Sequence, residues 1–434
     1  MKQYFLKCDI SGIQSFIFNV PSDGAARALK SRSVYVQNIA NDCLKQLNGF
    51  FKNDTVKELY NGGGNFYLEI ETNKTKEEID LKIQEVSDEY LKKDIFPHIA
   101  YIEKNTENIS DLLNEVNQKV QKTKMQRAVS FDLLDAKPEK IKNIDIFNEK
   151  GIKGHINGQI PQNDKKEALE FKEIAELSIG DSKLAALKLD VDNLGSLFRD
   201  RTEDDYKKLS NALKDFFDEN LLQLIKDLKM QQNIYIVFSG GDDCFLIGTW
   251  EKVLELAITL RQKFDEFQRN LKTKIISLPE EDITFSAGII VFQSHFPMLQ
   301  LAEEVEDALS ASKRADKKNS VTIFGKSLTW KEFEKAQELS KTVETLINNL
   351  DERNRENKSL LQIFRLVYPQ TKKMPKVWRL KYYLRRNVKA ENEETVKQIF
   401  DEYSQSLLLR HVGNKAKNPD VYLVASRWAE LLLK

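Results

Sequence analysis

From the N-terminus on, the hydrophobic positions of the chain form short apolar runs and longer segments at helical spacing. Residues 4–8 form an apolar run typical of a strand, and residues 34–47 carry apolar side chains at the spacing of an amphipathic helix. Two β-favouring runs split by a glycine-rich turn predict a hairpin at 59–70. A charged helix at 76–92 and a strand at 95–102 complete this first unit.

The same order returns in the second half of the chain. The second unit consists of a strand at 184–189, a helix at 209–228, a hairpin at 234–247, a helix at 253–267, a strand at 283–292, a helix at 301–309 and a strand at 320–324. The spacing also repeats, because Asp9 precedes Gly62 by 53 positions and Asp190 precedes Gly240 by 50. A β-α-β-β-α-β order that occurs twice predicts an α+β chain with two ferredoxin-like domains.

The remaining segments have different patterns. Residues 105–180 are polar and weakly periodic, which favours a linker or a small irregular insertion. Beyond residue 326 several amphipathic helices follow one another, and they predict a separate C-terminal helical bundle.

The hairpin of the second unit carries two adjacent acids at its tip, Asp242 and Asp243, directly after Ser-Gly-Gly. In a β-α-β-β-α-β sheet the first strand ends beside this hairpin, so Asp190 or Asp192 is expected to approach the two acids. Clustered carboxylates need a cation, and oxygen ligands suit Mg²⁺ or Mn²⁺. The alternative is a solvated turn that contains aspartate.

Such a site suits a nucleoside triphosphate. One ion of a pair lowers the pKa of an attacking hydroxyl, and the other neutralises a leaving pyrophosphate. Lys313 and Lys317 follow the predicted helix at 301–309 and are candidates to neutralise triphosphate oxygens. The alternative for these lysines is a solvated helix end, which the helix dipole favours.

The first unit keeps the hairpin without the acids. Its turn residues are Gly62, Gly63, Gly64 and Asn65. Ser11 stands where the second unit has Asp192, so that only Asp9 remains. We therefore expect one unit that holds two metal ions, and one degenerate unit that binds a nucleotide or serves as scaffold.

The composition indicates the number of domains and the cellular compartment, and it says little about the chemistry. The 434 residues indicate two to four domains. The chain has 67 basic and 67 acidic residues, so its net charge argues neither for nor against a nucleic-acid partner. The three cysteines lie far apart without disulfide or zinc spacing, and neither a signal peptide nor a membrane span is expected, which indicates the cytoplasm.

Several motifs occur in an order that resembles a known family. They are Asp-Ile-Ser-Gly-Ile-Gln, Gly-Gly-Gly-Asn-Phe-Tyr-Leu, Asp-Val-Asp-Asn-Leu-Gly, Ser-Gly-Gly-Asp-Asp, Phe-Ser-Ala-Gly-Ile, Lys-Asn-Ser-Val-Thr and a C-terminal Ala-Ser-Arg-Trp-Ala-Glu-Leu. The set resembles the large palm-domain subunit of type III CRISPR effector complexes, the Cas-ten family, over nearly the whole chain. The resemblance implies a degenerate palm at 1–106, a linker or insertion at 107–180, a catalytic palm at 181–326 and a helical domain at 327–434.

The resemblance also implies a reaction. Target RNA activates the palm pair to convert ATP into cyclic oligoadenylates, as the 3′-hydroxyl of one ATP attacks the α-phosphate of another and pyrophosphate leaves. By resemblance, Asp190, Asp242 and Asp243 are catalytic and hold Mg²⁺ or Mn²⁺ together with Val191. The nucleotide contacts so implied are Ser239, Gly240, Gly241, Asn193, Ser286 near the base, Lys313 near the phosphates, and Lys317.

The sequence departs from the family pattern in two ways. Many members begin with an HD nuclease domain, whereas this sequence starts at the first palm and none of its four histidines is followed by aspartate. We therefore expect no HD-type deoxyribonuclease activity. Many members also carry a four-cysteine zinc element between the palms, and residues 107–180 contain no cysteine, so no zinc is expected.

The expected partners are a guide RNA, the subunit that holds its 5′ end, small helical subunits, and target RNA as activator, without a membrane. A basic stretch near the C-terminus includes Lys372, Lys373, Lys376, Arg379, Lys381, Arg385, Arg386 and Lys389, together with Trp378, Tyr382 and Tyr383. It is a candidate to contact a nucleic-acid backbone, although the basic outer face of an amphipathic helix is the favoured interpretation.

Two other functions fit parts of the sequence. A structural subunit without catalysis is disfavoured, because a scaffold has no need of clustered acids. A stand-alone enzyme similar to diguanylate cyclases is disfavoured by the paired units in one chain, and by Cys244 directly after the aspartates. The acceptor stays open between ATP and another small molecule.

Overall fold

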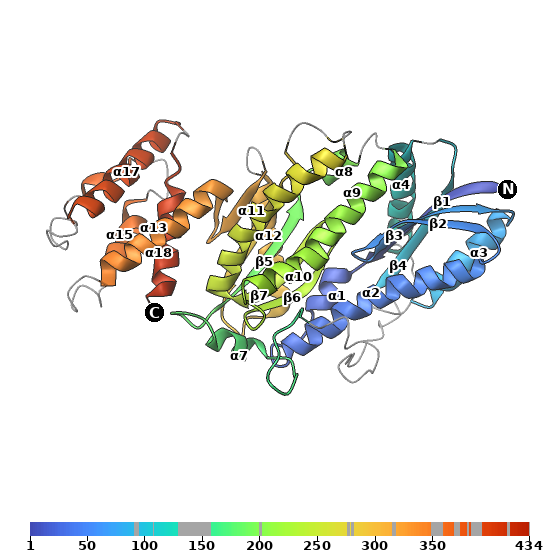
Figure 1. Ribbon diagram of the computed structural model, residues 1–434, viewed down its shortest axis with the longest axis horizontal. Helices are drawn as coiled ribbons and strands as arrows, with labels where there is room; N and C mark the ends of the chain where they lie inside the picture. Colours follow the sequence, from blue (N-terminus) through green and yellow to red (C-terminus); the bar gives the residue numbers. More distant parts are fainter. Residues whose placement is uncertain are drawn as a thin grey trace.

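The structure is a computed structural model of the chain. It describes residues 1–90, 95–106, 108–128, 158–198, 202–275, 278, 282–314, 318–348, 359–368, 374–379, 382, 393–414 and 417–433. Figure 1 shows an elongated molecule, with the N-terminal strands at one end, the C-terminal helices at the other and a second sheet between them.

The first sheet has four antiparallel strands in the order β2-β3-β1-β4. They are β1 (Lys2–Ser11), β2 (Thr55–Gly62), β3 (Asn65–Thr72) and β4 (Phe96–Glu103). Alternation along β1 buries Tyr4, Leu6, Cys8 and Ile10 on one face. Three helices cover that face: α1 (Ile13–Phe18), α2 (Ala25–Phe50) and α3 (Lys76–Asp88). The predicted ferredoxin-like arrangement is confirmed.

The second sheet repeats this arrangement and extends it, in the order β10-β9-β8-β5-β7-β6. Its strands are β5 (Leu184–Val191), β6 (Ile234–Gly240), β7 (Asp243–Thr249), β8 (Phe285–Phe292), β9 (Ser320–Ile323) and β10 (Lys326–Thr329). One face packs on α9 (Glu203–Asp215), a π-helical turn η2 (Phe216–Asn220), α10 (Leu221–Asp227) and α11 (Trp250–Lys274). The other face packs on α12 (Met298–Arg314).

Two expectations about boundaries need correction. Residues 109–128, expected to belong to an irregular linker, form α4 (Ile109–Ala128). Its buried residues recur every three or four positions, but polar residues between them obscure the period; they are Ile109, Leu112, Val116 and Val120. The second sheet also continues beyond residue 326 into β10. Phe324 and Gly325 form the turn that leads into this strand, and both have positive φ (51° and 71°). Phenylalanine rarely adopts such a conformation, so its presence in the sequence does not indicate a turn.

Helices α4 and α12 occupy equivalent places in the two halves. Each follows the fourth strand of its sheet and packs on the face that the preceding helices leave uncovered. In the first sheet this is the face on which Phe5 and Ile102 are buried against α4. The short helix α7 (Phe171–Glu176) lies in the described part of the expected linker and packs near the joint between the halves.

The two halves share one hydrophobic core. The ring of Phe18 from α1 lies 4.7 Å from that of Phe245 in β7, and Tyr235 of β6 donates a hydrogen bond to a carbonyl of α2 at 2.5 Å. Lys30 of α2 is buried in this joint, where its ammonium donates to the carbonyl oxygen of Ile236 at 3.2 Å and burial lowers its pKa to about 7. The helices of the first half therefore form part of the packing of the second sheet.

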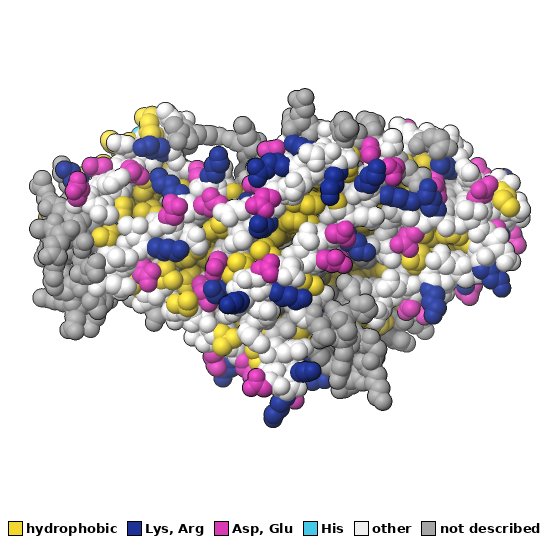
Figure 2. All heavy atoms as spheres, in the orientation of Figure 1, with side chains coloured by type: hydrophobic (Ala, Val, Ile, Leu, Met, Phe, Trp, Pro, Cys, Tyr) yellow, Lys and Arg dark blue, Asp and Glu magenta, His cyan; other side chains and the backbone are white. Residues whose placement is uncertain are grey.

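The C-terminal helices pack beside β10. They are α13 (Trp330–Asn348), α15 (Ser359–Val367), α17 (Glu393–His411) and α18 (Asp420–Leu432). Of the expected basic stretch at 372–389, the structure describes only residues 374–379 and 382, where Trp378 and Tyr382 are exposed. No helix in the described ranges is both long enough and apolar enough to cross a membrane. On the face drawn in Figure 2, acidic and basic side chains are interspersed.

We expect Gly288→Ala to destabilise the chain, because α12 packs directly on β8 at this position. An added Cβ would lie 2.6 Å from the carbonyl oxygen of Val305. Overpacking of this kind costs about 1–3 kcal/mol, which corresponds to a fall of several degrees in melting temperature. Gly49→Ala is the control, since its Cβ would meet nothing within 4 Å. Equal melting temperatures for Gly288→Ala and the wild type would contradict the close packing.

Candidate functional site

The register of the second sheet places two acids opposite each other. Asp190 at the end of β5 pairs with Asp243 at the start of β7, and cross-strand partners project from the same face. The backbone N–H of Val191 donates to the carbonyl oxygen of Asp242 at 3.1 Å, which ties the hairpin tip to the same strand. The structure thus brings Asp190, Val191, Asp242 and Asp243 to one edge, as the hairpin geometry predicts.

The electrostatics of this edge disfavour three negative charges. Burial raises the pKa of Asp242, and the nearby Asp190 carboxylate raises it further. Burial, followed by the charge of Asp242, raises the pKa of Asp243 to about 7. Burial and the neighbouring carboxylates thus both disfavour the charged form of these acids, which a nearby positive charge would favour. An oxygen-only donor set with this deficit fits a hard divalent cation such as Mg²⁺ or Mn²⁺.

A lysine supplies part of that charge. Lys313 at the end of α12 forms an ion pair with Asp190, with the ammonium nitrogen 2.5 Å from the carboxylate oxygen. In this arrangement, no group of three or more Asp, Glu, His or Cys side chains within the described residues is gathered as a metal site. Lys313 therefore stands beside the acids as the sequence predicts, and it is the residue that a cation at Asp190 would replace. Lys317 lies outside the described residues.

The turn before the acids depends on two glycines. Gly240 has φ 148° and Gly241 has φ 69°, values that favour glycine. Ser239 donates its hydroxyl to Asp218 of η2 at 3.3 Å, so its side chain contributes to holding the turn. Tyr60 from the first half covers the turn, because its hydroxyl would lie 2.5 Å from a Cβ at Gly241.

Asp192 and Ser286 bond to each other next to the acid edge, since Ser286 is the cross-strand partner of Asp190. Asp192 is buried two positions after Asp190, just beyond the end of β5. Ser286 is completely buried, and its hydroxyl donates to Asp192 at 2.8 Å. The expected contact between Ser286 and a nucleobase stays a prediction. Asn193 is exposed, and its side-chain oxygen accepts a hydrogen bond from Lys318 at 2.6 Å.

A cavity of about 360 Å³ lies between the two halves and reaches the acids. Gly241 and Asp242 line one end. Its wall residues include the aromatic side chains Tyr60, Tyr67, Phe198 and Tyr206 and the amides Asn65, Asn114 and Asn117. Burial raises the pKa of each of the three tyrosines, so they stay neutral at physiological pH and keep a hydroxyl proton to donate.

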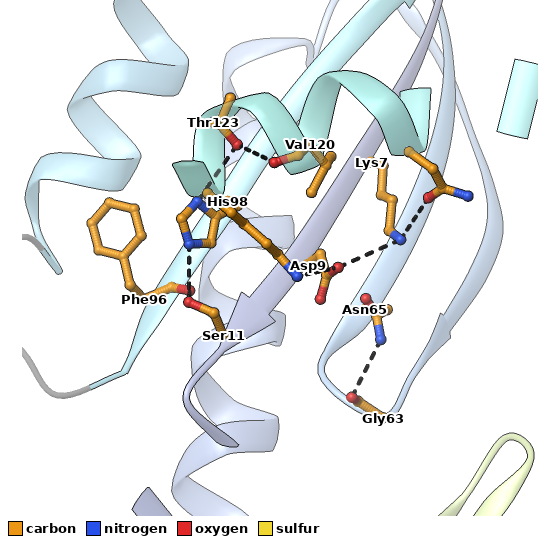
Figure 3. A network of polar contacts seen from close by, with 11 residues as sticks. Lys7, Asp9, Ser11, Gly63, Asn65, Phe96, His98, Val120 and Thr123 are labelled. Carbon is orange, nitrogen blue, oxygen red and sulfur yellow. Dashed lines mark hydrogen bonds and ion pairs between the residues drawn. The ribbon is translucent and has the colours of Figure 1, made fainter. Parts of the chain in front are cut away.

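The first half shows the same edge with different chemistry (Figure 3). Asp9 pairs across the strands with Asn65, the position that Asp243 has in the second half. Asp9 forms ion pairs with Lys124 of α4 at 2.8 Å and with Lys7 at 3.6 Å. With one carboxylate already held between two ammonium groups, this edge has no comparable deficit of positive charge.

Sequence reasoning did not anticipate several of these residues. Tyr60, Tyr206 and Lys124 reach the two edges only through packing between segments far apart in the chain. The one available signal was the internal repeat, since Lys124 on α4 corresponds to Lys313 on α12.

Comparison with known proteins agrees with this architecture. The model of the Cas10/Cmr2 second palm domain matches residues 183–322, and the model of Csm1 subunit domain B matches residues 2–145. The two matches together span most of the chain.

Individual relatives match over part of their length. A Cas10/Csm1 protein of subtype III-A from Enterococcus italicus, named as a CRISPR system single-strand-specific deoxyribonuclease, is 24% identical over 75% of this chain and 54% of its own length. The protein of that name from Mycobacterium tuberculosis is 30% identical over 41% of this chain and 22% of its own length. The chain thus spans about half the length of the first relative, and less of the second.

Solved structures share the fold. A Csm1–Csm4 cassette in complex with AMPPNP has a TM-score of 0.73 at 18% identity, and covers 100% of this chain and 69% of its own. A cassette in complex with cA4 has a TM-score of 0.70 at 16% identity, with 100% and 70% coverage. With both domain models and these relatives in agreement, the chain belongs to the Cas10/Csm1 family of type III CRISPR effector subunits.

Proposed function

We propose that this chain is the nucleotidyltransferase subunit of a type III-A CRISPR complex, and that it converts ATP into cyclic oligoadenylate when target RNA binds. The observation that carries this proposal is the acid edge of the second palm, where Asp190 faces Asp243 beside Lys313 and Asp242. Family membership and the nucleotides in the solved Csm1–Csm4 cassettes support ATP as the substrate.

The proposed roles follow from the geometry. Asp190, Asp242, Asp243 and the carbonyl oxygen of Val191 would hold Mg²⁺ or Mn²⁺. The ions would activate a 3′-hydroxyl and neutralise the departing pyrophosphate. Lys313 would leave Asp190 and pair with phosphate oxygens, exchanging one anionic partner for another. Gly240 and Gly241 present backbone without side chains, which leaves room for phosphate beside the turn.

The cavity between the palms supports a nucleotide with its base toward the aromatic wall. Tyr206, Phe198 and Tyr67 offer ring surface, and Asn114 with Asn117 offers amide donors and acceptors. Because Asp9 is already paired with Lys124 and Lys7, we assign the metal chemistry to the second palm alone. The first palm then contributes one wall of the cavity and positions the acceptor.

The partners proposed for the chain come from the same relatives. The solved cassettes contain a Csm4 subunit, and one belongs to the type III-A CRISPR–Csm interference complex. We propose that this chain binds a Csm4-type subunit next to a guide RNA, and that small helical subunits contact α13 to α18. A cytoplasmic location fits these partners.

The decisive experiment replaces the acids of the turn. The complex is reconstituted with guide and target RNA, incubated with labelled ATP and Mg²⁺ or Mn²⁺, and its products are analysed by mass spectrometry. Asp242→Ala combined with Asp243→Ala should lower product formation by more than about 100-fold, because ligands rather than their supporting contacts are lost. Unchanged product formation would show that the chain is a scaffold or that catalysis lies elsewhere.

A matched control removes two acids without touching the edge. Asp88 and Asp227 are both exposed, on α3 and α10. Asp88→Ala combined with Asp227→Ala changes the net charge equally and should leave product formation at the wild-type level. A similar loss in this control would attribute the effect to charge or folding.

The raised pKa of Asp243 also predicts a pH dependence of stability. Between about pH 4, where an exposed aspartate titrates, and about pH 7 the folded state keeps a proton that the unfolded state releases. The stability linked to this group is therefore present at low pH and is lost as the pH rises through about 7.

Asp243→Asn should remove this dependence. In EDTA at pH 8 the variant should melt a few degrees above the wild type, on the order of 1 kcal/mol, and the difference should shrink at pH 5. Saturating Mg²⁺ should reduce the advantage at pH 8, since a bound cation compensates the wild-type carboxylates. Parallel profiles of melting temperature against pH for the two proteins would show that the pKa of Asp243 is not raised in the folded state.

A further inference from the structure

Asp192 is the acid of the second palm that the proposed mechanism leaves without a role. Its side chain is 4% exposed and lies under the catalytic edge. Three donors bond to the carboxylate: the hydroxyls of Thr284 and Ser286 at 2.8 Å each, and the backbone N–H of Asn319 at 3.0 Å. Its own backbone N–H donates to the carbonyl oxygen of Thr284 at 2.8 Å.

These donors come from two different segments of the chain. Thr284 directly precedes β8 and Ser286 lies at its start, whereas Asn319 follows α12 and leads into β9. The Asp192 carboxylate therefore joins the end of β5 at Val191, and the turn that follows at Asn193, to the segment that carries Lys318. A second bond closes the same connection, from the Lys318 ammonium to the side chain of Asn193 at 2.6 Å.

Backbone strain gathers at the two segments that Asp192 joins. Asn193, Lys318 and Asn319 all have positive φ, at 55°, 50° and 46°. Such conformations are unfavourable for residues with a Cβ, and they persist where surrounding contacts hold them. Lys318 and Asn319 are consecutive. The hydrogen bond from the backbone N–H of Asn319 to the Asp192 carboxylate therefore holds the segment where two residues in a row have positive φ.

The first palm uses a serine and a histidine at the same place (Figure 3). In the strand registers, His98 pairs with Asp9 as Ser286 pairs with Asp190, and Ser11 takes the position of Asp192. The Ser11 hydroxyl and the His98 ring nitrogen Nε2 lie 2.9 Å apart, and His98 is buried. The joint between the first and fourth strands is thus kept in both palms, but only the second palm builds it on a buried carboxylate.

We propose that Asp192 is a positioning residue of the second palm: by accepting hydrogen bonds from Thr284, Ser286 and Asn319 it fixes the turn of Val191 and Asn193 against the segment of Lys318. The turn would present the Val191 carbonyl to a metal ion, and Lys318 would lie on the phosphate side. This role rests on the proposed nucleotidyl transfer, whereas the structural connection itself does not.

The test compares two substitutions with opposite expectations. Asp192→Ala removes every acceptor. Asp192→Asn keeps the geometry, because its oxygen can accept from Thr284 and Asn319 while its amide donates to the rotatable Ser286 hydroxyl. In the reconstituted complex, Asp192→Ala should lower kcat for ATP by about 10- to 100-fold, in the range for contacts that support metal ligands. Asp192→Asn should stay within a few-fold, with KM less affected than kcat in both variants.

A second readout does not depend on activity. Hydrogen–deuterium exchange should show faster exchange at residues 193–197 and 318–320 in Asp192→Ala, but not in Asp192→Asn. If the wild type made no adenylate product, the proposed function would fail while this measurement still decided the structural connection. Wild-type exchange and kcat in Asp192→Ala, or equal damage in Asp192→Asn, would overturn the positioning role.

Two further variants guard against loss of folding. Thr284→Val removes one donor at similar volume and replaces Asp192→Ala if that variant proves insoluble. It should lower kcat by several-fold. Asp420→Ala is the matched control, since Asp420 is also a buried carboxylate, bound by Tyr368 at 2.7 Å in the C-terminal helices. Its melting temperature should fall without a change in kcat or KM. A fall in kcat in this control that matched Asp192→Ala would assign the effect to general destabilisation.

Discussion

The arrangement of the second palm depends on a repulsion that the backbone enforces. Antiparallel pairing sets Asp190 opposite Asp243, and the sheet cannot relieve the contact by sliding. A shift of one residue would turn Leu187 and Leu189 out of the core and bring Lys188 and Asp190 into it. The buried strands thus fix the carboxylates close to each other, and the positive charge of neighbouring lysines partly offsets their repulsion. Lys188 and Lys313 both lower the pKa of an acid that burial has raised.

The two palms show how one backbone supports different chemistry. In each, a strand end with aspartate lies beside a glycine hairpin, and a helix crossing the sheet brings a lysine to that aspartate. The second palm places Asp243 across from its aspartate, where the first places Asn65. Replacing one carboxylate by an amide removes the repulsion, so the first palm is electrostatically satisfied without a cation. Function here differs by a few side chains on conserved geometry within one chain.

Much of this architecture could be predicted from the sequence, because strand alternation and helical spacing are strong in both units. The approach of Asp190 to Asp243 followed from topology alone. The helix α4 was missed since its apolar residues are few and its polar ones many, and β10 was missed because Phe324 adopts a conformation untypical of its residue type. The full burial of Ser286 and its hydrogen bond to Asp192 were missed for a different reason: they depend on tertiary packing, which motif resemblance does not fix.

Tyr60, a residue of the first palm, lies directly against the acidic turn of the second palm. Its hydroxyl lies against Gly241, so the hairpin without acids forms the ceiling over the hairpin that has them. Whatever occupies the acids must share space with a ring that belongs to the other palm. The common core beneath joins the helices of the first palm to the second sheet. A molecule that lies beside Asp242 in the cavity therefore also meets Tyr60, a residue of the palm that has no acids in its turn.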